Sequence, residues 1–257
     1  MPTRSSRSSA ALNAYVLHRY DWSESSLILE LFTREQGRLA VAAKGAKRPH
    51  SQLRSVLLPF QRVNVTLTRS SVPEGAPPEV QTLRSAEYAG GAPMPGGAAL
   101  FPGFYLNELL LKLLARHDAH AALFDAYAQT LPALGAADDA RAQAALRAFE
   151  LVLLRETGVL PDLAVVTQTQ QPLREGDRYS LSADAGIAAA RDDGPALEAA
   201  HWLQLQAALE HGAMEAIAEA CRAALPELKL LLRNCLHYHL GSSPLRTRQV
   251  MLELQNP

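Results

Sequence analysis

The stretch RVNVTLT at residues 62–68 decides the fold of the first part of this chain. Val63, Val65 and Leu67 alternate with polar residues, and this period of two predicts a strand with one face in a core. Other short runs rich in β-branched and apolar residues predict further strands, at residues 11–19, 26–33, 38–44 and 80–86. Five short strands, with no long helical run between most of them, predict a small barrel, and the five-stranded OB-fold is the natural candidate.

The residues beyond this barrel are predicted to be helical. The segment GGAPMPGG at 90–97 is typical of a linker, because Gly and Pro interrupt both strands and helices. Asp138 and Asp139 are typical of the first turn of a helix, and Gly158 is typical of the residue just after a helix end. Helices are expected at residues 100–116, 119–134, 138–157, 195–210, 213–224 and 226–240, with an irregular insertion at 158–193.

The expected fold class is therefore α+β, with two domains. Residues 1–10 are Ser-rich and basic and are expected to form a disordered arm. An OB-fold domain at 11–89 and a linker at 90–97 follow, and an all-helical domain with the irregular insertion spans 98–257.

The charge is divided between these parts. Residues 1–70 contain eleven Lys and Arg but four Asp and Glu, a net charge of +7, whereas residues 71–257 carry −8. A basic module favours a polyanionic partner, because each phosphate that Lys or Arg neutralises releases condensed counterions. The acidic remainder indicates a different task.

The bulk composition is that of a soluble protein. A chain of 257 residues, 48% of them hydrophobic, is long enough to bury two cores. Two cysteines, Cys221 and Cys235, do not form a disulfide framework, so a reducing cytoplasm is the expected location. The longest uncharged stretch, between Glu87 and Glu108, contains three prolines, so no membrane-spanning helix is expected.

Candidate catalytic groups lack the spacing of known sites. His117 and His120 have the i, i+3 spacing of a helix face, and Cys235, His237 and His239 form a second set. No CxxC, HExxH, GxSxG or GxxxxGK[ST] motif occurs. Solvated or capping histidines account for these residues, so we expect no catalytic residue, no metal site and no cofactor. The main alternative is a metal-dependent hydrolase that uses these His and Cys groups.

The cations of the basic module gather around one loop. Lys44, Lys47 and Arg48 surround Gly45, whose backbone can approach a phosphate closely. An ordinary solvated loop is the alternative, but the charge of this module favours nucleic acid. The predicted DNA-binding cations of this module are Arg34, Arg38, Lys44, Lys47, Arg48 and Arg54.

Aromatic residues in the same module are candidates for base stacking, which single-strand binding usually adds. At most one or two aromatic residues are expected to contact bases, and Tyr20 and Trp22, in the first turn between strands, are the candidates. Tyr15, Phe32 and Phe60 are better explained by packing in or around the barrel.

The acidic, helical part has its own candidate site. Arg147 stands beside an apolar helical stripe that includes Phe149 and Leu153. The arginine could hold a carboxylate while the stripe accepts an apolar peptide side chain. Core packing beside a surface arginine is the alternative.

A second alternative function is a helical, ligand-binding transcription regulator with a β-rich DNA-binding head. Such a regulator prefers a specific duplex. A sequence-independent binder instead takes unrelated single strands, with a steep salt dependence.

Several short segments resemble the bacterial RecO family of DNA repair proteins. In the first half these are AYVLH, WSESS, AKGA, LPF and TLRSAE, at residues 14–18, 22–26, 43–46, 58–60 and 82–87. In the second half they are YLNELL, LRAFE and LGSSPLRTR, at residues 105–110, 146–150 and 240–248. Each match is short, but together they follow in order along most of the chain.

The resemblance implies an N-terminal OB-fold, a helical C-terminal domain and a recombination mediator that is not an enzyme. Such proteins bind single- and double-stranded DNA, anneal complementary strands and bind the acidic C-terminal tail of single-stranded DNA-binding protein (SSB). With RecR, often alongside RecF, they help to load RecA onto SSB-coated DNA. Arg147 then becomes the candidate for the carboxylate of the SSB tail. Arg246 and Arg248, in a Pro-containing basic tail, become candidates for a second DNA contact.

One departure from the family concerns zinc. Many members carry four cysteines for zinc in the region that corresponds to residues 158–190. This chain has no cysteine there, so the tetrahedral thiolate site cannot form. Zinc is therefore not expected, and packing alone is expected to hold the insertion together.

Overall fold

The structure is a computed structural model that describes residues 10–68, 79–91, 94–135, 138–191, 194–241, 245–247 and 249–250. It divides into two compact units. Unit 1 comprises Met1–Met94 and Leu114–Phe124, and unit 2 comprises Pro95–Leu113 and Asp125–Pro257. The expected basic arm lies outside the described residues apart from Ala10.

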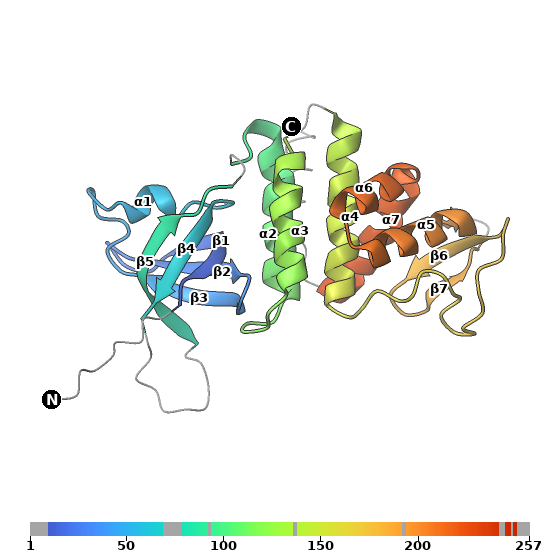
Figure 1. Cartoon of the computed structure of the whole chain (residues 1–257), viewed down its shortest axis with the longest axis horizontal. Helices are drawn as coiled ribbons and strands as arrows, with labels where there is room; N and C mark the ends of the chain where they lie inside the picture. The colour runs from blue at the N-terminus through green and yellow to red at the C-terminus, as the bar shows by residue number, and fades with distance from the viewer. Residues whose placement is uncertain are drawn as a thin grey trace. The chain divides into compact units, whose positions relative to one another are not determined.

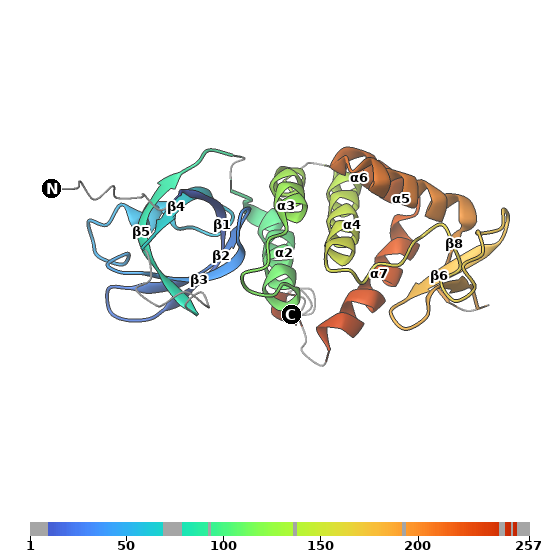
Figure 2. The same cartoon turned by 60° about the horizontal axis from the view of Figure 1, so that its bottom comes forward.

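The described strands of unit 1 form a closed barrel in the order β1-β2-β3-β5-β4. Neighbouring strands are antiparallel except β3 and β5, which are parallel, and β4 pairs with β1 to close the ring (Figures 1 and 2). A short helix, α1, lies between β3 and β4, and the whole arrangement is that of an OB-fold. The predicted α+β class with an N-terminal barrel is confirmed. The elements are β1 (Leu12–Asp21), β2 (Leu27–Thr33), β3 (Gly37–Ala43), α1 (Leu53–Val56), β4 (Arg62–Leu67) and β5 (Val80–Tyr88).

The barrel core follows the alternation that the sequence predicts. Along β4, Val63, Val65 and Leu67 are buried in the core, whereas Asn64 between them is exposed. Ala46, just beyond β3, also lies in this core and has no exposed surface. The loop that carries the basic cluster is therefore fixed to the barrel by one of its own residues.

Residues 114–124 pack on the barrel, although the sequence places them among the expected helices. The ring of Phe124 lies 5.2 Å from that of Tyr15 and 5.5 Å from that of Phe32. The N–H of His117 donates to the carbonyl of Arg38 over 3.0 Å. The helix expected at 100–116 ends earlier, at Leu113. Beyond it the chain turns onto β3, where Arg116 bridges to Arg38, and His117 takes a left-handed conformation with φ of 61°.

Unit 2 is mainly helical. Its described elements are η1 (Gly97–Ala99), α2 (Leu100–Leu113), α3 (Ala121–Ala133, which begins in unit 1), α4 (Asp139–Glu156), β6 (Arg178–Ser182), β7 (Gly186–Ala189), β8 (Leu197–Glu198), α5 (Ala199–His211), α6 (Met214–Arg222) and α7 (Leu225–Leu240). The expected helices are confirmed, with small shifts at their ends. Asp138 caps α4 as predicted, because its carboxylate accepts from the N–H of Ala140. Helix α4 packs against both α6 and α7.

Unit 2 also holds a small sheet in the order β7-β6-β8. Strands β6 and β7 lie in the expected irregular insertion, whereas β8 lies where the helix at 195–210 was expected to begin. Leu181 on β6 and Ile187 on β7 are buried. The indole N–H of Trp202 on α5 donates to the carbonyl of Tyr179 over 3.0 Å. Apolar packing and hydrogen bonds therefore hold the described part of this insertion.

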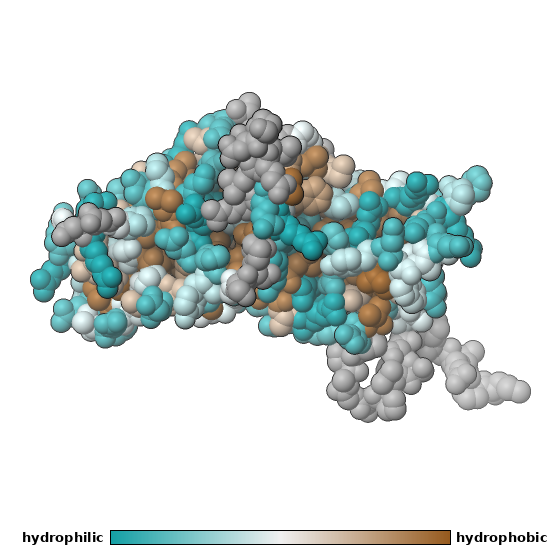
Figure 3. All heavy atoms as spheres, turned by 180° about the vertical axis from the view of Figure 1, so that it is seen from behind, coloured by the Kyte–Doolittle hydropathy of each residue, from teal (hydrophilic) through white to brown (hydrophobic). Residues whose placement is uncertain are grey.

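The molecular surface is mixed in polarity. On the face in Figure 3, apolar patches are interspersed with polar residues. None of the described helices is both long and apolar enough to cross a membrane.

Candidate nucleic-acid interface

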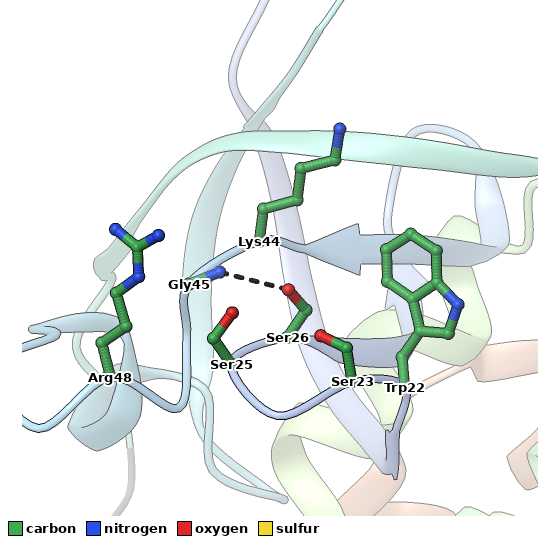
Figure 4. A pocket seen from close by; sticks show the side chains of 7 residues that line it. All are labelled: Trp22, Ser23, Ser25, Ser26, Lys44, Gly45 and Arg48. Carbon is green, nitrogen blue, oxygen red and sulfur yellow. Dashed lines mark hydrogen bonds between the residues drawn. The ribbon is translucent and has the colours of Figure 1, made fainter.

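Two loops of unit 1 meet beside the barrel, one joining β1 to β2 and the other following β3. The N–H of Lys47 donates to the carbonyl of Ser25 over 3.0 Å. The N–H of Gly45 donates to the hydroxyl of Ser26 over 3.4 Å, the dashed line in Figure 4. These two contacts join segments that are about twenty residues apart in the chain.

The loops form a pocket of about 390 Å³. It is lined by Trp22, Ser23, Ser25, Ser26, Lys44, Gly45 and Arg48. Figure 4 shows the side chains of Trp22, Lys44 and Arg48 projecting to the same side of the two loops, with Lys44 between the other two. The pocket thus places two cations and an aromatic ring around small hydroxyl groups.

Gly45 makes the turn beneath Arg48 possible. Its φ is 72°, a left-handed conformation that side chains other than glycine rarely adopt. A Cβ atom at Gly45 would lie 3.5 Å from Nε of Arg48, so the arginine side chain packs over this glycine.

The cations predicted around this loop have different environments. Lys44, Arg48 and Arg54 are exposed, and Arg54 lies on α1. The ammonium of Lys47 is half-buried and lies 3.1 Å from the carboxylate of Asp21 at the end of β1. Lys47 therefore helps to join the two loops, and its charge is partly compensated.

Arg34 and Arg38 lie at the other end of the hairpin formed by β2 and β3. In this hairpin Leu27 pairs with Ala43 at one end and Thr33 pairs with Gly37 at the other. Six steps along β3 separate these ends by roughly 20 Å. The predicted cations therefore do not form one cluster, because the turn that contains Arg34 lies a strand length away from the pocket.

Arg38 is part of an ion cluster around the buried carboxylate of Glu30. Its Nε lies 4.0 Å from the carboxylate of Glu30, to which the guanidinium of Arg116 also donates. Burial is the main cause that lowers the pKa of Arg38, while the charge of Glu30 opposes the shift. Arg38 was expected to bind phosphate, but the structure places it beside Glu30, whose single carboxylate is shared with Arg116. Through this carboxylate, Arg116 joins residues 114–124 to the barrel.

The aromatic residues divide by exposure in the expected way. Tyr20 is 48% exposed and Trp22 is 56% exposed. Tyr15, Phe32 and Phe60 are buried. Tyr20 and Trp22 are therefore accessible to a ligand.

The basic tail is only partly described. Arg248 lies outside the described residues, and Arg246 is exposed. The carboxylate of Glu108 on α2 accepts from the N–H groups of Arg246 and Thr247, over 2.8 and 3.0 Å. Burial alone raises the pKa of Glu108, but these hydrogen bonds outweigh it and hold the pKa below its ordinary value. The backbone at Arg246 is thus anchored while its side chain faces solvent.

Arg147 lies in the interior of unit 2, where α2 and α4 meet. Its Nη2 donates over 2.6 Å to Oε1 of Glu150, which also accepts from the hydroxyl of Tyr105 over 2.6 Å. Glu150 is completely buried, and this burial raises its pKa although Arg147 opposes the shift. Among the described residues, Nε of Arg147 is buried without a hydrogen-bond partner.

The apolar stripe beside Arg147 is not at the surface. Phe149 and Leu153 have no exposed surface. Helices α6 and α7 pack against α4, so residues expected to form a peptide-binding stripe belong to the core. The structure therefore shows the core-packing alternative for this stripe, although Arg147 beside it is buried and not at the surface.

The histidines and cysteines do not come together as a metal site. In the parts of the chain that the structure covers, no group of three or more His, Cys, Asp or Glu residues could hold a metal ion. Burial raises the pKa of the Cys235 thiol to about 11, so this group is protonated at neutral pH.

Two features of unit 1 had no clear signal in the sequence. Arg116 was assigned to a helix, and only the folded chain brings it to Glu30. The serines of the pocket are also lining residues that no chemical motif indicated. Their run, SESS at residues 23–26, could have suggested a tight turn with free hydroxyl groups.

Comparison with known proteins agrees with this fold. The family model described as "Recombination protein O N terminal" matches residues 8–73, and "Recombination protein O C terminal" matches residues 97–249. "DNA repair protein RecO" of Variovorax paradoxus (strain S110) is 52% identical over 252 residues, covering 94% of this chain and 95% of that protein. "DNA repair protein RecO" of Polaromonas sp. (strain JS666 / ATCC BAA-500) is 50% identical over 244 residues, with the same two coverages.

The fold and the site define a two-unit protein in which an OB barrel with basic loops is joined to a helical unit. Both family models match in the expected order, and the relatives are similar over nearly their whole length. The chain belongs to the RecO family of DNA repair proteins. This family assignment is favoured over the hydrolase and the transcription regulator considered as alternatives.

Proposed function

We propose that this protein is a recombination mediator that holds single- and double-stranded DNA by its phosphates at the two loops of unit 1. The observation that carries the proposal is the exposure of Lys44 and Arg48 on the same side of two loops that hydrogen bonds hold together. Because the loop backbone is already held in place, a polyanion need not order the two loops before it meets these cations.

The mechanism is binding and transfer without catalytic turnover. Phosphate contacts carry no sequence information, so any strand can occupy the site. Because such contacts leave most base edges free, a held strand can pair with its complement, and this supports an annealing activity. Arg34 and Arg246, both exposed, are candidates for additional phosphate contacts.

The partners follow from the family to which the chain belongs. We propose that the helical unit binds the acidic C-terminal tail of SSB, and that the protein acts with RecR, often alongside RecF, to load RecA onto SSB-coated DNA in the cytoplasm. Arg147 stays the candidate for the tail carboxylate, because its Nε has no hydrogen-bond partner among the described residues. It lies in the interior of unit 2, so the carboxylate can reach it only if the helices around it move. A terminal carboxylate would satisfy this donor.

The DNA-binding proposal is tested by removing three exposed cations, Lys44, Arg48 and Arg54, through substitution by glutamine. Affinity for a random single-stranded oligonucleotide, measured by fluorescence anisotropy, should fall by at least about tenfold. Lys47 is left unchanged because it pairs with Asp21.

A matched control removes the same number of exposed cations from unit 2, by substitution of Arg174, Arg191 and Arg233 with glutamine. This variant should bind DNA within about twofold of the wild type. Equal losses in both triple variants would contradict the location of the site in unit 1.

The tail-binding proposal is tested with Arg147→Lys, which keeps a positive charge beside Glu150 but removes the guanidinium fork. Affinity for a peptide with the sequence of the SSB tail should fall about tenfold, while DNA affinity and melting temperature stay close to wild type. Unchanged peptide binding in a folded variant would exclude Arg147 as the carboxylate ligand.

A further inference from the structure

Trp22 presents an aromatic surface that the barrel does not bury. Its exposed fraction is 56%, whereas the other tryptophan of the chain, Trp202, has no exposed surface. Large aromatic side chains normally bury much of their area, and covering an exposed indole with a flat apolar group is favourable. Trp22 is therefore available as a platform for a ligand.

The chemistry around Trp22 combines this platform with positive charge. Lys44 and Arg48 line the same pocket, and their side chains project to the same side as the indole (Figure 4). A volume of about 390 Å³ lies in the range of small-ligand sites. A ligand that suits the pocket needs one planar ring system and one anionic group, and a nucleotide has both.

The pocket is organised before any ligand binds. The N–H groups of Trp22 and Ser23 both donate to the carbonyl of Ser26, over 3.2 and 3.3 Å, so the loop after β1 is folded back on itself. The ion pair between Lys47 and Asp21 joins this loop to the one after β3. A ligand therefore meets a formed site and need not order the two loops first.

We infer that this pocket holds one unpaired nucleotide, with its base stacked on Trp22 and its phosphate beside Lys44 and Arg48. This inference rests on the proposed function, and it specifies that the pocket recognises an unpaired base together with its phosphate. In a duplex, both faces of a base are covered by its neighbours, so an internal base pair cannot stack on the indole. The pocket thereby gives the protein a preference for unpaired DNA.

Trp22, not Tyr20, is the stacking residue. Tyr20 is also exposed, but it is absent from the residues that line the pocket, and its ring lies 4.4 Å from that of His18 in an edge contact. Tyr20→Ala is therefore the matched control, because it removes an exposed aromatic ring of the same unit from outside the pocket.

The test compares two oligonucleotides of equal length and charge, oligothymidine and an abasic backbone without bases. Oligothymidine should quench the tryptophan fluorescence of the wild type and leave the fluorescence of Trp22→Phe unchanged, because only the buried Trp202 remains there. By anisotropy, Trp22→Ala should lose about five- to hundredfold in affinity for oligothymidine, the range expected of one stacked base, with abasic binding close to wild type. Tyr20→Ala should bind both oligonucleotides as the wild type does.

Each contrary result has a distinct meaning. If Trp22→Ala binds oligothymidine as tightly as the wild type, or if the wild type shows no quenching while it binds, the stacking inference is overturned and phosphate binding stands. If the wild type binds neither oligonucleotide, the proposed function fails and the inference fails with it. A parallel loss in Tyr20→Ala would overturn the assignment of stacking to the pocket.

Discussion

At the residue scale, the role of a cation depends on which acid lies within reach. Arg116 and Glu30 are 86 positions apart in sequence, yet they form an ion pair, and Arg38 lies beside the same carboxylate. Lys47 likewise meets Asp21, 26 positions away. Lys44 and Arg48, close to Lys47 in the chain, remain exposed. Cations that look equivalent in the sequence therefore divide into structural and accessible ones only after folding.

Arg147→Met should destabilise unit 2, because it leaves the carboxylate of Glu150 buried without its charged partner. Removing one member of a buried ion pair costs about 3–5 kcal/mol. The free energy of unfolding can be measured with urea by following Trp202, in a Trp22→Phe background so that one tryptophan of unit 2 reports.

The effect of Arg147→Met should depend on pH. Because burial raises the pKa of Glu150, the folded state binds a proton there more readily than the unfolded chain does. The ionised carboxylate of Glu150 therefore destabilises the folded state at pH values above its folded-state pKa. This loss of stability is relieved as the pH falls toward the ordinary pKa of glutamate and the group takes up a proton. The difference from wild type should therefore be larger at about pH 8 than at about pH 5. The double variant Arg147→Met with Glu150→Gln should recover part of the loss, and no recovery would contradict the charge explanation.

At the scale of elements, the turn between β2 and β3 meets residues 114–124 so closely that it requires glycine. Gly37 has φ of 69°, and a Cβ atom there would lie 1.7 Å from the carbonyl oxygen of Asp118. The neighbouring hydrogen bond from His117 to Arg38 continues the same contact. This turn is therefore the place where a segment distant in the chain is fixed to the barrel.

Gly37→Ala should displace residues 114–124 and destabilise unit 1. The left-handed conformation alone costs about 1 kcal/mol for alanine, and the backbone clash adds to it. Hydrogen exchange at the amide of His117 should become faster. Gly45→Ala is the matched control, since it has a similar φ of 72° but its nearest contact is the flexible side chain of Arg48 at 3.5 Å. Equal exchange rates in the two variants would contradict the clash.

At the scale of the whole molecule, the basic residues of the N-terminal part remain together in unit 1, but they lie at more than one place on it. The accessible cations of unit 1 lie around the pocket and, separately, at the turn that contains Arg34. A polyanion that spans both places would meet more cations than either place offers. DNA binding should therefore depend on the sum of these contacts.

The dependence of DNA affinity on salt should measure that sum. For single strands, the slope of log K against log salt changes by about 0.7 for each phosphate contact. Replacing Lys44, Arg48 and Arg54 with glutamine should reduce the slope by about 2. The matched triple variant in unit 2 should keep the slope of the wild type. A slope unchanged by the first variant would show that these cations do not contact phosphates.

The fold class and most elements of this protein follow from local patterns in its amino-acid sequence. The alternation of Val63, Val65 and Leu67 with polar residues puts one face of this strand in a core. A capping residue such as Asp138 acts on the helix turn next to it, so neighbouring residues in the sequence are enough to predict where that helix begins. The family resemblance was also carried by short segments that a sequence displays directly. Exposure of Trp22 could be predicted because it lies in a turn.

Only the tertiary structure decided which functional candidates remain accessible. For Phe149 and Leu153 the sequence left a peptide-binding stripe and core packing open, and folding places them in the core, because several helices cover α4. The partners of Arg38 and Lys47 come from distant segments, and the pocket beside Trp22 exists because two loops meet. Such contacts depend on how strands and helices close on one another, and no local pattern records that closure.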